Sequence, residues 1–147
     1  MVEFYDITYD EIKVIKGLWE KNRQYHERSS EYFRELYQSI NFEQRIKGLE
    51  VFDQDLLKIT VARKNDAYIG YCLSTVSNGK GEVESIHVDA ACRGDGVGEE
   101  LMKRHIQWLR NKNCTVIGVT VSQENESTIS FYKKLGFYPN TVYMQLK

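Results

Sequence analysis

The sequence predicts a single α/β domain with a mixed, mostly antiparallel sheet of six or seven strands, flanked by about four helices. Three observations lead to this fold class. The chain has 147 residues and one proline, and neither a linker nor a repeat divides it. Its apolar residues recur at helical spacing in the first third and in strand-like runs in the second. A glycine-rich stretch then joins a strand pattern to an amphipathic helix pattern and a further strand.

The N-terminal third is predicted to be one strand followed by helices. Residues 2–7 have a strand pattern, and Thr8 with Glu11 has the capping-box spacing of a helix that begins near residue 9. Further helical stretches are expected over residues 29–40 and 41–51. The apolar stripe of the first helix comprises Ile12, Ile15, Leu18 and Trp19.

The middle third predicts a meander of three antiparallel strands over residues 56–63, 68–76 and 82–88, because short turns separate them. Strand alternation in the last of these gives two sets of side chains that face opposite sides of the sheet. One set comprises Glu82, Glu84, Ile86 and Val88, and the other Val83, Ser85 and His87.

The last third predicts a helix after the glycines, then a strand, a helix and a closing strand. Residues 114–121 are apolar and β-branched, which is typical of a buried strand. A helical crossover separates this strand from the meander, so it runs parallel to its neighbour. Residues 127–137 predict the last helix with Gly136 as its C-cap, and residues 141–146 predict the strand that closes the sheet.

Composition narrows the classes of function. A net charge of -1 with 28% charged residues leaves no broad basic surface, which disfavours nucleic-acid binding. The three cysteines form no C-x-x-C pair and lie beside no histidines at metal-ligand spacing, which favours reduced thiols in a cytoplasmic protein. The N-terminus is acidic where a secretion signal is basic, and no run approaches about 18 apolar residues. We therefore expect neither export nor membrane anchoring.

Three glycines between Gly94 and Gly98 lie at the start of a predicted helix. Glycines there let a ligand approach the backbone, and the unpaired N–H groups of a first helical turn favour an anion. A Walker loop would continue with Lys and Ser/Thr, but Glu99 follows Gly98, and Glu99 also stands where a G-x-G-x-x-G fingerprint needs its last glycine. The stretch predicts a phosphate site of another architecture, and a turn without a ligand is the alternative.

Two motifs in this order resemble those of the GNAT acetyltransferase family. The first is R-x-x-G-x-G, with Arg93, Gly96 and Gly98, after a strand that ends in "HV". The second is "NESTISFYKKLGF", similar to the family's Asn after the fifth strand and its F-Y-x-x-L-G-F helix. The resemblance covers the whole chain and implies one bacterial-type N-acetyltransferase domain over residues 1–147, with splayed parallel fourth and fifth strands. One departure is Ala90, where many members carry proline.

The resemblance also implies acetyl-CoA as the cosubstrate, without a metal ion. Backbone groups of Ile86, His87 and Val88 would pair with the pantetheine arm in the manner of an added strand, and Asn125 would contact the arm. Helix capping is the alternative role of Asn125, and the two roles are compatible. The residues expected to hold the pyrophosphate through their N–H groups are Arg93, Gly94, Asp95, Gly96, Val97, Gly98 and Glu99.

Tyr132 matches the family's general acid, which touches the sulfur of the cosubstrate. When an amine attacks the thioester, CoA leaves as a thiolate whose conjugate acid resembles cysteine, with a pKa of about 8.5. A phenol with a pKa of about 10 is therefore a competent proton donor. The alternative is an aromatic ring packed in the core with Phe131, in a chain with ten tyrosines.

Glu84 is the candidate base. It lies nine residues before Arg93, a spacing that resembles polyamine and aminoglycoside acetyltransferases. A carboxylate near the amine binds the ammonium and accepts its proton, directly or through water. A solvated charge at the sheet edge is the alternative. His87 could also move protons near neutral pH, but the strand alternation sends it away from Glu84 and favours a packed histidine.

The acceptor implied is the primary amine of a small molecule such as a polyamine, an aminoglycoside or an amino-acid-like compound, acetylated by direct transfer in a ternary complex. In the family the first helices wall the acceptor pocket, which implies contacts from Trp19, Tyr25, His26 and Tyr32. Ordinary amphipathic packing is the alternative for these four residues. A protein N-terminal or lysine acetyltransferase, a non-catalytic acyl-CoA-binding module and a homodimer stay open.

Overall fold

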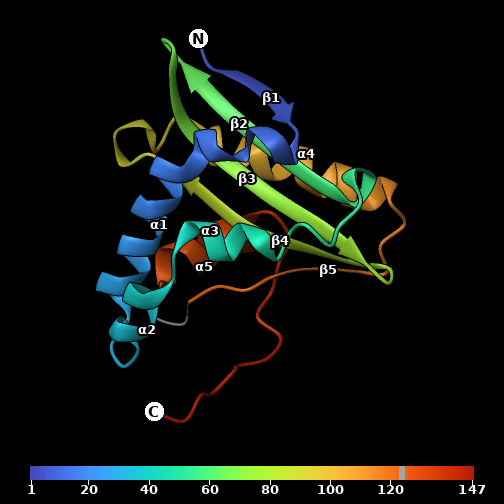
Figure 1. The fold of residues 1–147 in the computed structure, drawn as a ribbon. Coiled ribbons are helices and arrows are strands. Elements are labelled where there is room, and N and C mark those ends of the chain that lie inside the picture. Colours follow the sequence, from blue (N-terminus) through green and yellow to red (C-terminus); the bar gives the residue numbers. More distant parts are fainter. Residues whose placement is uncertain (123–124) are drawn as a thin grey trace.

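The computed structural model describes residues 1–122 and 125–147 and arranges them around one mixed sheet (Figure 1). The five strands of this described part lie in the order β1-β2-β3-β4-β5; neighbours are antiparallel except β4 and β5, which are parallel. The predicted meander and parallel crossover are therefore confirmed. The strands are β1 Glu3–Ile7, β2 Leu57–Lys64, β3 Ala67–Ser77, β4 Lys80–Val88 and β5 Val116–Val119.

Helices cover both faces of the sheet. The N-terminal helices η1, α1 and α3 pack on one face, with α2 against α1, while α4 and α5 pack on the other. None of the described helices is long and apolar enough to cross a membrane. Their bounds are η1 Tyr9–Ile15, α1 Lys16–Ser29, α2 Arg34–Ser39, α3 Phe42–Lys47, η2 Gln54–Leu56, η3 Ala90–Cys92, α4 Val97–Asn111 and α5 Glu126–Lys134.

Each face of the sheet has its own apolar core. On the first face the predicted stripe of η1 and α1 is buried, and the Trp19 ring packs edge-on against Phe42 with centroids 5.5 Å apart. On the second face α4, the amphipathic helix predicted after the glycines, buries its apolar side. The apolar residues buried on that side are Val97, Leu101, Met102 and Leu109.

A chain of polar side chains crosses the core beneath α4. His105 is fully buried, with Nδ1 2.7 Å from Ser74 Oγ and Nε2 2.8 Å from Thr60 Oγ1. The Thr60 hydroxyl donates to the Asp6 carboxylate at 2.7 Å, and Lys58 donates to the same carboxylate at 2.7 Å. Each member is hydrogen-bonded, which is the condition under which a core tolerates polar groups.

The first N-terminal helix begins as a 3₁₀ helix, and the next two are shorter than predicted. The Thr8 N–H donates to the Glu11 carboxylate at 3.1 Å, as the capping-box spacing predicts, but the helix that follows is the 3₁₀ helix η1. The stretch over residues 29–40 is helical only in α2, because Ser30 Oγ accepts a hydrogen bond from the Phe33 N–H and forms a turn. The next helix, α3, covers only part of residues 41–51.

The closing strand predicted over residues 141–146 is absent. From residue 138 onward the chain is exposed and has neither helix nor strand, and Figure 1 shows it leaving the body of the fold. A strand forms only where its backbone groups find a partner, and this segment has none in the described chain. The prediction of six or seven strands was therefore wrong. The prediction of a buried fifth strand was also wrong, because β5 is the sheet edge and Val116 is 55% exposed.

Candidate functional site

The parallel strands β4 and β5 separate partway along β4, and a cavity opens between them. They pair only as far as Val83 and Val119, whereas β4 continues to Val88. From Glu84 onward no strand of the described chain lies beside this edge of β4, and a cavity of about 570 Å³ occupies the opening. Backbone groups on that edge are therefore free to meet a ligand.

A β-bulge in β4 sets the direction of the side chains at the opening. The register between β3 and β4 shifts after Leu73, which leaves Glu84 as the extra residue. Glu84 therefore contacts Arg45 of α3, and His87 faces α1, whereas Ile86 packs in the core beneath α4. The prediction that His87 points away from Glu84 was wrong, because the alternation of side chains along a strand is interrupted at a bulge.

The glycine-rich loop forms one end of the cavity. Gly94 and Gly96 have φ angles of 90° and 79°, in the left-handed region, and a Cβ on either would meet nothing within 4 Å. Gly96 is the N-cap of α4, so N–H groups of the first helical turn lie at this end. Arg93 donates from Nε to the Val88 carbonyl at 3.0 Å, which ties the loop to β4. Asp95 is exposed and does not line the cavity.

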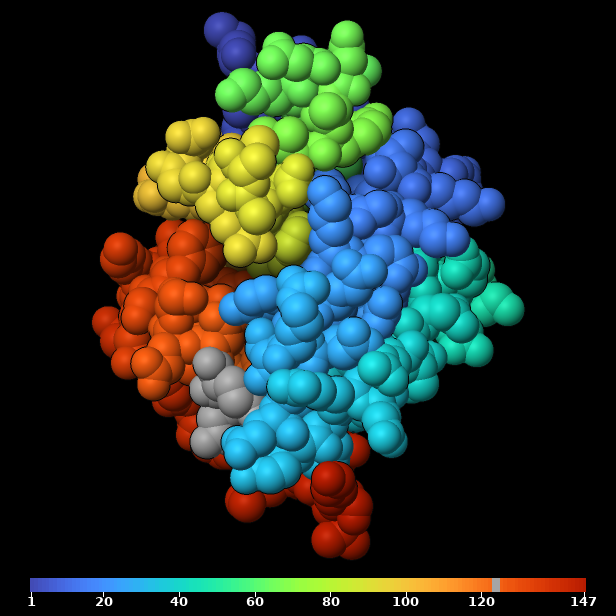
Figure 2. All heavy atoms as spheres, turned by 90° about the vertical axis from the view of Figure 1, so that its left-hand side faces the viewer, coloured from blue at the N-terminus to red at the C-terminus, as the bar shows by residue number. Residues whose placement is uncertain are grey.

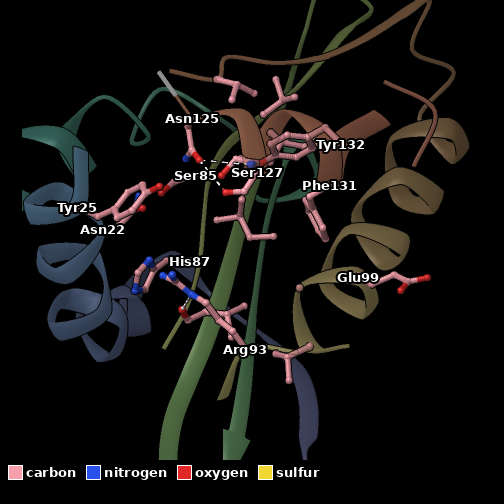
Figure 3. Close-up of a pocket in the computed structure, with 18 of the residues that line it drawn as sticks. Asn22, Tyr25, Ser85, His87, Arg93, Glu99, Asn125, Ser127, Phe131 and Tyr132 are labelled. Atoms are coloured by element: carbon pink, nitrogen blue, oxygen red, sulfur yellow. Dashed lines mark hydrogen bonds between the residues drawn. The ribbon is translucent and has the colours of Figure 1, made fainter. Parts of the chain in front are cut away.

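Tyr132 lines the cavity from α5, beside Phe131 (Figure 3). It is 5% exposed, and its ring packs edge-on against Phe131 and Phe137, with centroids 5.3 and 5.8 Å apart. Burial, together with the nearby Cys72 thiol, raises the pKa of the phenol, so it stays protonated at neutral pH. No described residue hydrogen-bonds this hydroxyl. The alternative of core packing is therefore confirmed, and the role of general acid stays a prediction.

Asn125 lies at the start of α5 and also lines the cavity. Its side-chain oxygen accepts hydrogen bonds from the Thr128 N–H at 3.3 Å and from the Ser127 hydroxyl at 3.2 Å. The alternative prediction of helix capping is therefore confirmed. These two bonds use only the oxygen, so the amide N–H groups are left for a ligand.

The Glu84 carboxylate is held from two sides. Arg45 Nη2 lies 3.1 Å from Oε1, and the Thr75 hydroxyl donates to Oε2 at 2.7 Å. The side chain is 19% exposed and lines the cavity, so Glu84 is not a solvated charge at the sheet edge. Sequence reasoning missed Arg45, because it lies 39 residues before Glu84 and no local pattern links the two.

Two histidines, His26 and His87, also line the cavity. Burial, together with the Arg93 charge, lowers the pKa of His87 to about 4. Burial also lowers the pKa of His26, whose ring stacks on Tyr37 with centroids 5.8 Å apart. Both imidazoles are therefore mainly neutral near pH 7.

The α1 wall of the cavity consists of Asn22, Tyr25 and His26. Figure 3 shows the first two of these side chains on the helix. Residues three and four apart share a helix face, so the three side chains project together. Sequence reasoning missed Asn22, although its spacing from the other two was the available signal. The Arg93 guanidinium lies 5.9 Å from the centroid of the Tyr25 ring and links this wall to the loop.

The other two residues expected at the acceptor, Trp19 and Tyr32, lie outside the cavity. Trp19 belongs to the buried stripe of α1, which confirms its alternative of ordinary packing. Tyr32 follows the end of α1 and is 59% exposed. The turn made by Ser30 separates it from the helix face that carries Tyr25 and His26.

The cysteines are free thiols and form no cluster with other ligand-type side chains in the described residues. Cys72 is buried, which raises its pKa, and Cys92 and Cys114 are partly buried. Within residues 1–122 and 125–147, no three His, Cys, Asp or Glu side chains gather in a way that could hold a metal ion.

The fold and the cavity together define the class of the protein. It is an α/β domain whose parallel strands open beside a glycine-rich helix N-terminus, as the resemblance implied for a transferase of acyl groups. Residues 18–137 match the family model described as "Acetyltransferase (GNAT) family". The chain therefore belongs to the GNAT acetyltransferase family, which confirms the resemblance.

Curated relatives match parts of this chain. Glucosamine 6-phosphate N-acetyltransferase 1 of Oryza sativa is 36% identical over 66 residues, which cover 45% of this chain and 38% of that protein. N-alpha-acetyltransferase 30 of Schizosaccharomyces pombe is 29% identical over 82 residues, which cover 52% and 55%. An uncharacterised N-acetyltransferase of Methanocaldococcus jannaschii is 36% identical over 56 residues, which cover 38% and 25%. The chain thus spans between a quarter and about half of these relatives.

Solved structures support the fold over the whole chain. A protein from Bacillus halodurans superposes with a TM-score of 0.76 at 14% identity and covers 99% of both chains. An aminoglycoside N-acetyltransferase in complex with CoA superposes with a TM-score of 0.73 at 18% identity, covering 100% of this chain and 94% of the other. At such identities the likeness establishes the fold alone.

Proposed function

We propose that the protein transfers the acetyl group of acetyl-CoA to the primary amine of a small molecule, by direct attack within one ternary complex. The observation that carries this proposal is the cavity between β4 and β5. It has helix N–H groups at one end, Tyr132 on one side and the polar wall of α1 on the other. We assign the reaction to the cytoplasm, which the three free thiols support.

Acetyl-CoA suits the groups that line this cavity. The unpaired edge of β4 from Glu84 to Val88 offers N–H and C=O groups to the amides of the pantetheine arm, as to an added strand. The open space at Gly94 and Gly96, with the first-turn N–H groups of α4, suits the pyrophosphate. The free amide N–H groups of Asn125 are further donors to the arm.

In the proposed reaction the amine nitrogen attacks the thioester carbonyl carbon, the C–S bond breaks and CoA leaves as a thiolate. Tyr132 donates its phenolic proton to the sulfur as that bond breaks. A backbone N–H of β4 near Val88 stabilises the negative charge that develops on the carbonyl oxygen.

The amine must be neutral before it attacks. Glu84 accepts its proton, directly or through water, at lone pairs that Arg45 and Thr75 do not use. His87 is a second acceptor on the same side of β4, and its low pKa keeps the ring neutral. The two residues make distinguishable predictions, which are argued in the Discussion.

The relatives support a small amine as the acceptor. Those whose names state a substrate include a glucosamine 6-phosphate acetyltransferase, and the structural neighbours include aminoglycoside acetyltransferases. The similarity to N-alpha-acetyltransferase 30 supports a protein N-terminus as the second candidate. Thr120 disfavours that candidate, since N-terminal acetyltransferases resembling the ribosomal-protein type carry a glutamate there.

The experiment that tests the proposal is release of CoA thiol from acetyl-CoA across a panel of polyamines, aminoglycosides, amino sugars, amino acids and short peptides. We expect release with one class of small amine, and little with peptides. Preference for a peptide would favour the N-terminal candidate. Tight CoA binding without release for any amine would contradict the transferase and favour a non-catalytic acyl-CoA-binding module.

A further inference from the structure

The side of the cavity toward α1 is the part left for the acceptor. Figure 2 shows α1 in blue, the glycine-rich loop in yellow and α5 in orange meeting on one face of the molecule, and all three line the cavity. The loop and α5 carry the groups proposed to hold the cosubstrate. The lining side chains on the α1 side, from α1 and β4, are Asn22, Tyr25, His26, Glu84, Ser85 and His87.

Among the described residues, a single carboxylate lies on this side of the cavity, and it is already paired. Of the lining residues that the structure describes, Glu84 and Glu99 are the acidic ones. Arg45 lies 3.1 Å from the Glu84 carboxylate. Glu99 pairs with Lys103 at 3.0 Å, and Figure 3 shows it on the side opposite α1. A charged group that leaves water needs a counter-charge, and the described lining offers none to a second ammonium.

Positive charges add to this imbalance. The Arg93 guanidinium lies 5.9 Å from the centroid of the Tyr25 ring. Lys21 precedes the cavity wall on α1 and pairs with Asp89 at 3.2 Å. The charges of Arg93 and Lys21 both act on His87, so they reach the lining of the cavity. These surroundings repel a second positive charge on the acceptor.

Neutral hydrogen-bonding groups make up the rest of this side. Tyr71 is fully buried, and its hydroxyl lies 2.7 Å from Ser85 Oγ, while the Asn22 side chain approaches the same hydroxyl. Ser85 of β4 and Asn22 of α1 are therefore neighbours at the cavity wall. Both side chains keep donors and acceptors that Tyr71 does not use. Such groups match the hydroxyls of a ligand.

Building on the proposed transfer, we propose that the acceptor is a hydroxylated amine with a single positive charge, selected by Asn22 and Ser85 through its hydroxyls. Glu84 takes the one proton that this amine must lose. An acceptor without hydroxyls would leave Asn22 and Ser85 without the hydrogen bonds that water gave them. A second ammonium would enter the cavity without a counter-charge. The charge balance thus separates this acceptor from the polyamines and aminoglycosides that the sequence implied.

The test measures kcat/KM by release of CoA thiol for four amines that combine the two properties. Glucosamine has hydroxyls and one charge, kanamycin has hydroxyls and several charges, spermidine has several charges and no hydroxyl, and cyclohexylamine has one charge and no hydroxyl. We expect kcat/KM for glucosamine to exceed that for each of the others by about tenfold or more.

The possible failures are distinguishable. Preference for kanamycin or spermidine would overturn the argument from charge, and equal values for cyclohexylamine and glucosamine would overturn the role of the hydroxyls. The proposed transfer would stand in both cases. Release with no amine of this set or of the wider panel would overturn the transfer and the acceptor class together.

Two variants test the residues that select the hydroxyls. Asn22→Ala and Ser85→Ala should each lower kcat/KM for glucosamine by about fivefold more than for cyclohexylamine. Each leaves Tyr71 one neighbour, so the circular dichroism spectrum should persist. Gln24→Ala is the control, since Gln24 is exposed on α1 outside the cavity. An equal loss for both amines would mean that Asn22 and Ser85 do not select hydroxyls.

A third variant tests the charge balance. Arg45→Gln leaves the Glu84 charge without its cation, so the ratio of kcat/KM for kanamycin to that for glucosamine should rise by about tenfold. Lys47→Gln is the matched control, because it removes an exposed charge from the same helix outside the cavity. An unchanged ratio in Arg45→Gln would overturn the argument that the Glu84–Arg45 pair excludes polycations.

Discussion

The Arg45 guanidinium lies 3.1 Å from the Glu84 carboxylate, so a helix from the first half of the chain reaches the bulge of β4. The bulge turns Glu84 toward α3, and the Thr75 hydroxyl fixes its other oxygen. A carboxylate held in this way keeps one position at the cavity wall and still has lone pairs to offer. The ion pair is partly exposed, so we infer that it positions the Glu84 carboxylate and adds little to the stability of the fold.

Glu84→Gln should lower kcat/KM by roughly 10²–10⁴-fold if Glu84 accepts the proton of the amine, because glutamine has no basic oxygen. Glu82→Gln is the matched control, since Glu82 lies on the same strand outside the cavity. Steady-state kinetics at saturating acetyl-CoA gives the comparison. Near-normal activity of Glu84→Gln together with a large loss of activity in His87→Gln would indicate that His87, and not Glu84, accepts the proton of the amine.

Tyr132→Phe should lower kcat by roughly 10²–10⁴-fold and leave the affinity for acetyl-CoA unchanged. The change removes only the hydroxyl, which no described residue hydrogen-bonds, so ring packing and thermal stability should persist. Initial rates and calorimetric titration with CoA measure the two quantities separately. Unchanged turnover would exclude Tyr132 as the acid and leave its core packing as its role.

Gly96→Ala should weaken acetyl-CoA binding, because a side chain at φ 79° is strained and the loop must move the first-turn N–H groups of α4. The strain also costs roughly 1–2 kcal/mol of stability. Gly17→Ala is the control, since a Cβ there meets nothing within 4 Å and its φ is not positive. KM for acetyl-CoA and urea unfolding report the two effects. Equal KM values in both variants would count against an anion site at this loop.

Much of the fold could be predicted because its signals are local. The stripe of Ile12, Ile15, Leu18 and Trp19 and the short turns of the meander each lie within a few residues of one another, and each was found in place. The glycines before α4 were predicted as an N-terminal loop on the same basis. Of the side chains expected at the site, Tyr132, Glu84, Asn125, Tyr25 and His26 meet at one cavity.

What could not be predicted depends on distant partners. The bulge that brings Glu84 and His87 to one side arises from the register with β3, and the ion pair with Arg45 arises from the packing of α3. Residues 141–146 have the pattern of a strand, but a strand requires an edge beside it, and the pattern cannot say which edge. Local reasoning therefore found the members of the site and missed how they face one another.

The buried His105 is hydrogen-bonded at both ring nitrogens. The Asp6 carboxylate can only accept hydrogen bonds, so the Thr60 hydroxyl donates its proton to Asp6. The Thr60 oxygen must then accept a hydrogen bond from the Nε2–H group of His105. Nδ1 is then unprotonated and accepts from the Ser74 hydroxyl. A second proton on the ring would oppose that bond, and burial, with the Lys58 charge nearby, lowers the pKa of His105 from 6.5 to about 3.

Stability should therefore depend on pH through His105. Between its ordinary pKa of 6.5 and its folded value of about 3, the unfolded chain binds the proton and the folded chain does not. Its contribution to the free energy of unfolding is thus complete above pH 6.5 and is lost as the pH falls, by at most roughly 3 kcal/mol at pH 4. Urea unfolding at several pH values measures this loss.

His105→Gln should lower stability by about 1–3 kcal/mol at pH 7, because two buried hydrogen bonds are disturbed, and should flatten the pH dependence between pH 6.5 and 4. The pKa of His87, about 4, places its titration in the same window, but His87 is present in both proteins. Groups that titrate in both proteins, the carboxylates included, contribute equally to the two free energies of unfolding and cancel in their difference. Parallel stability curves across this window would mean that His105 takes up its proton without breaking the chain from Ser74 to Asp6.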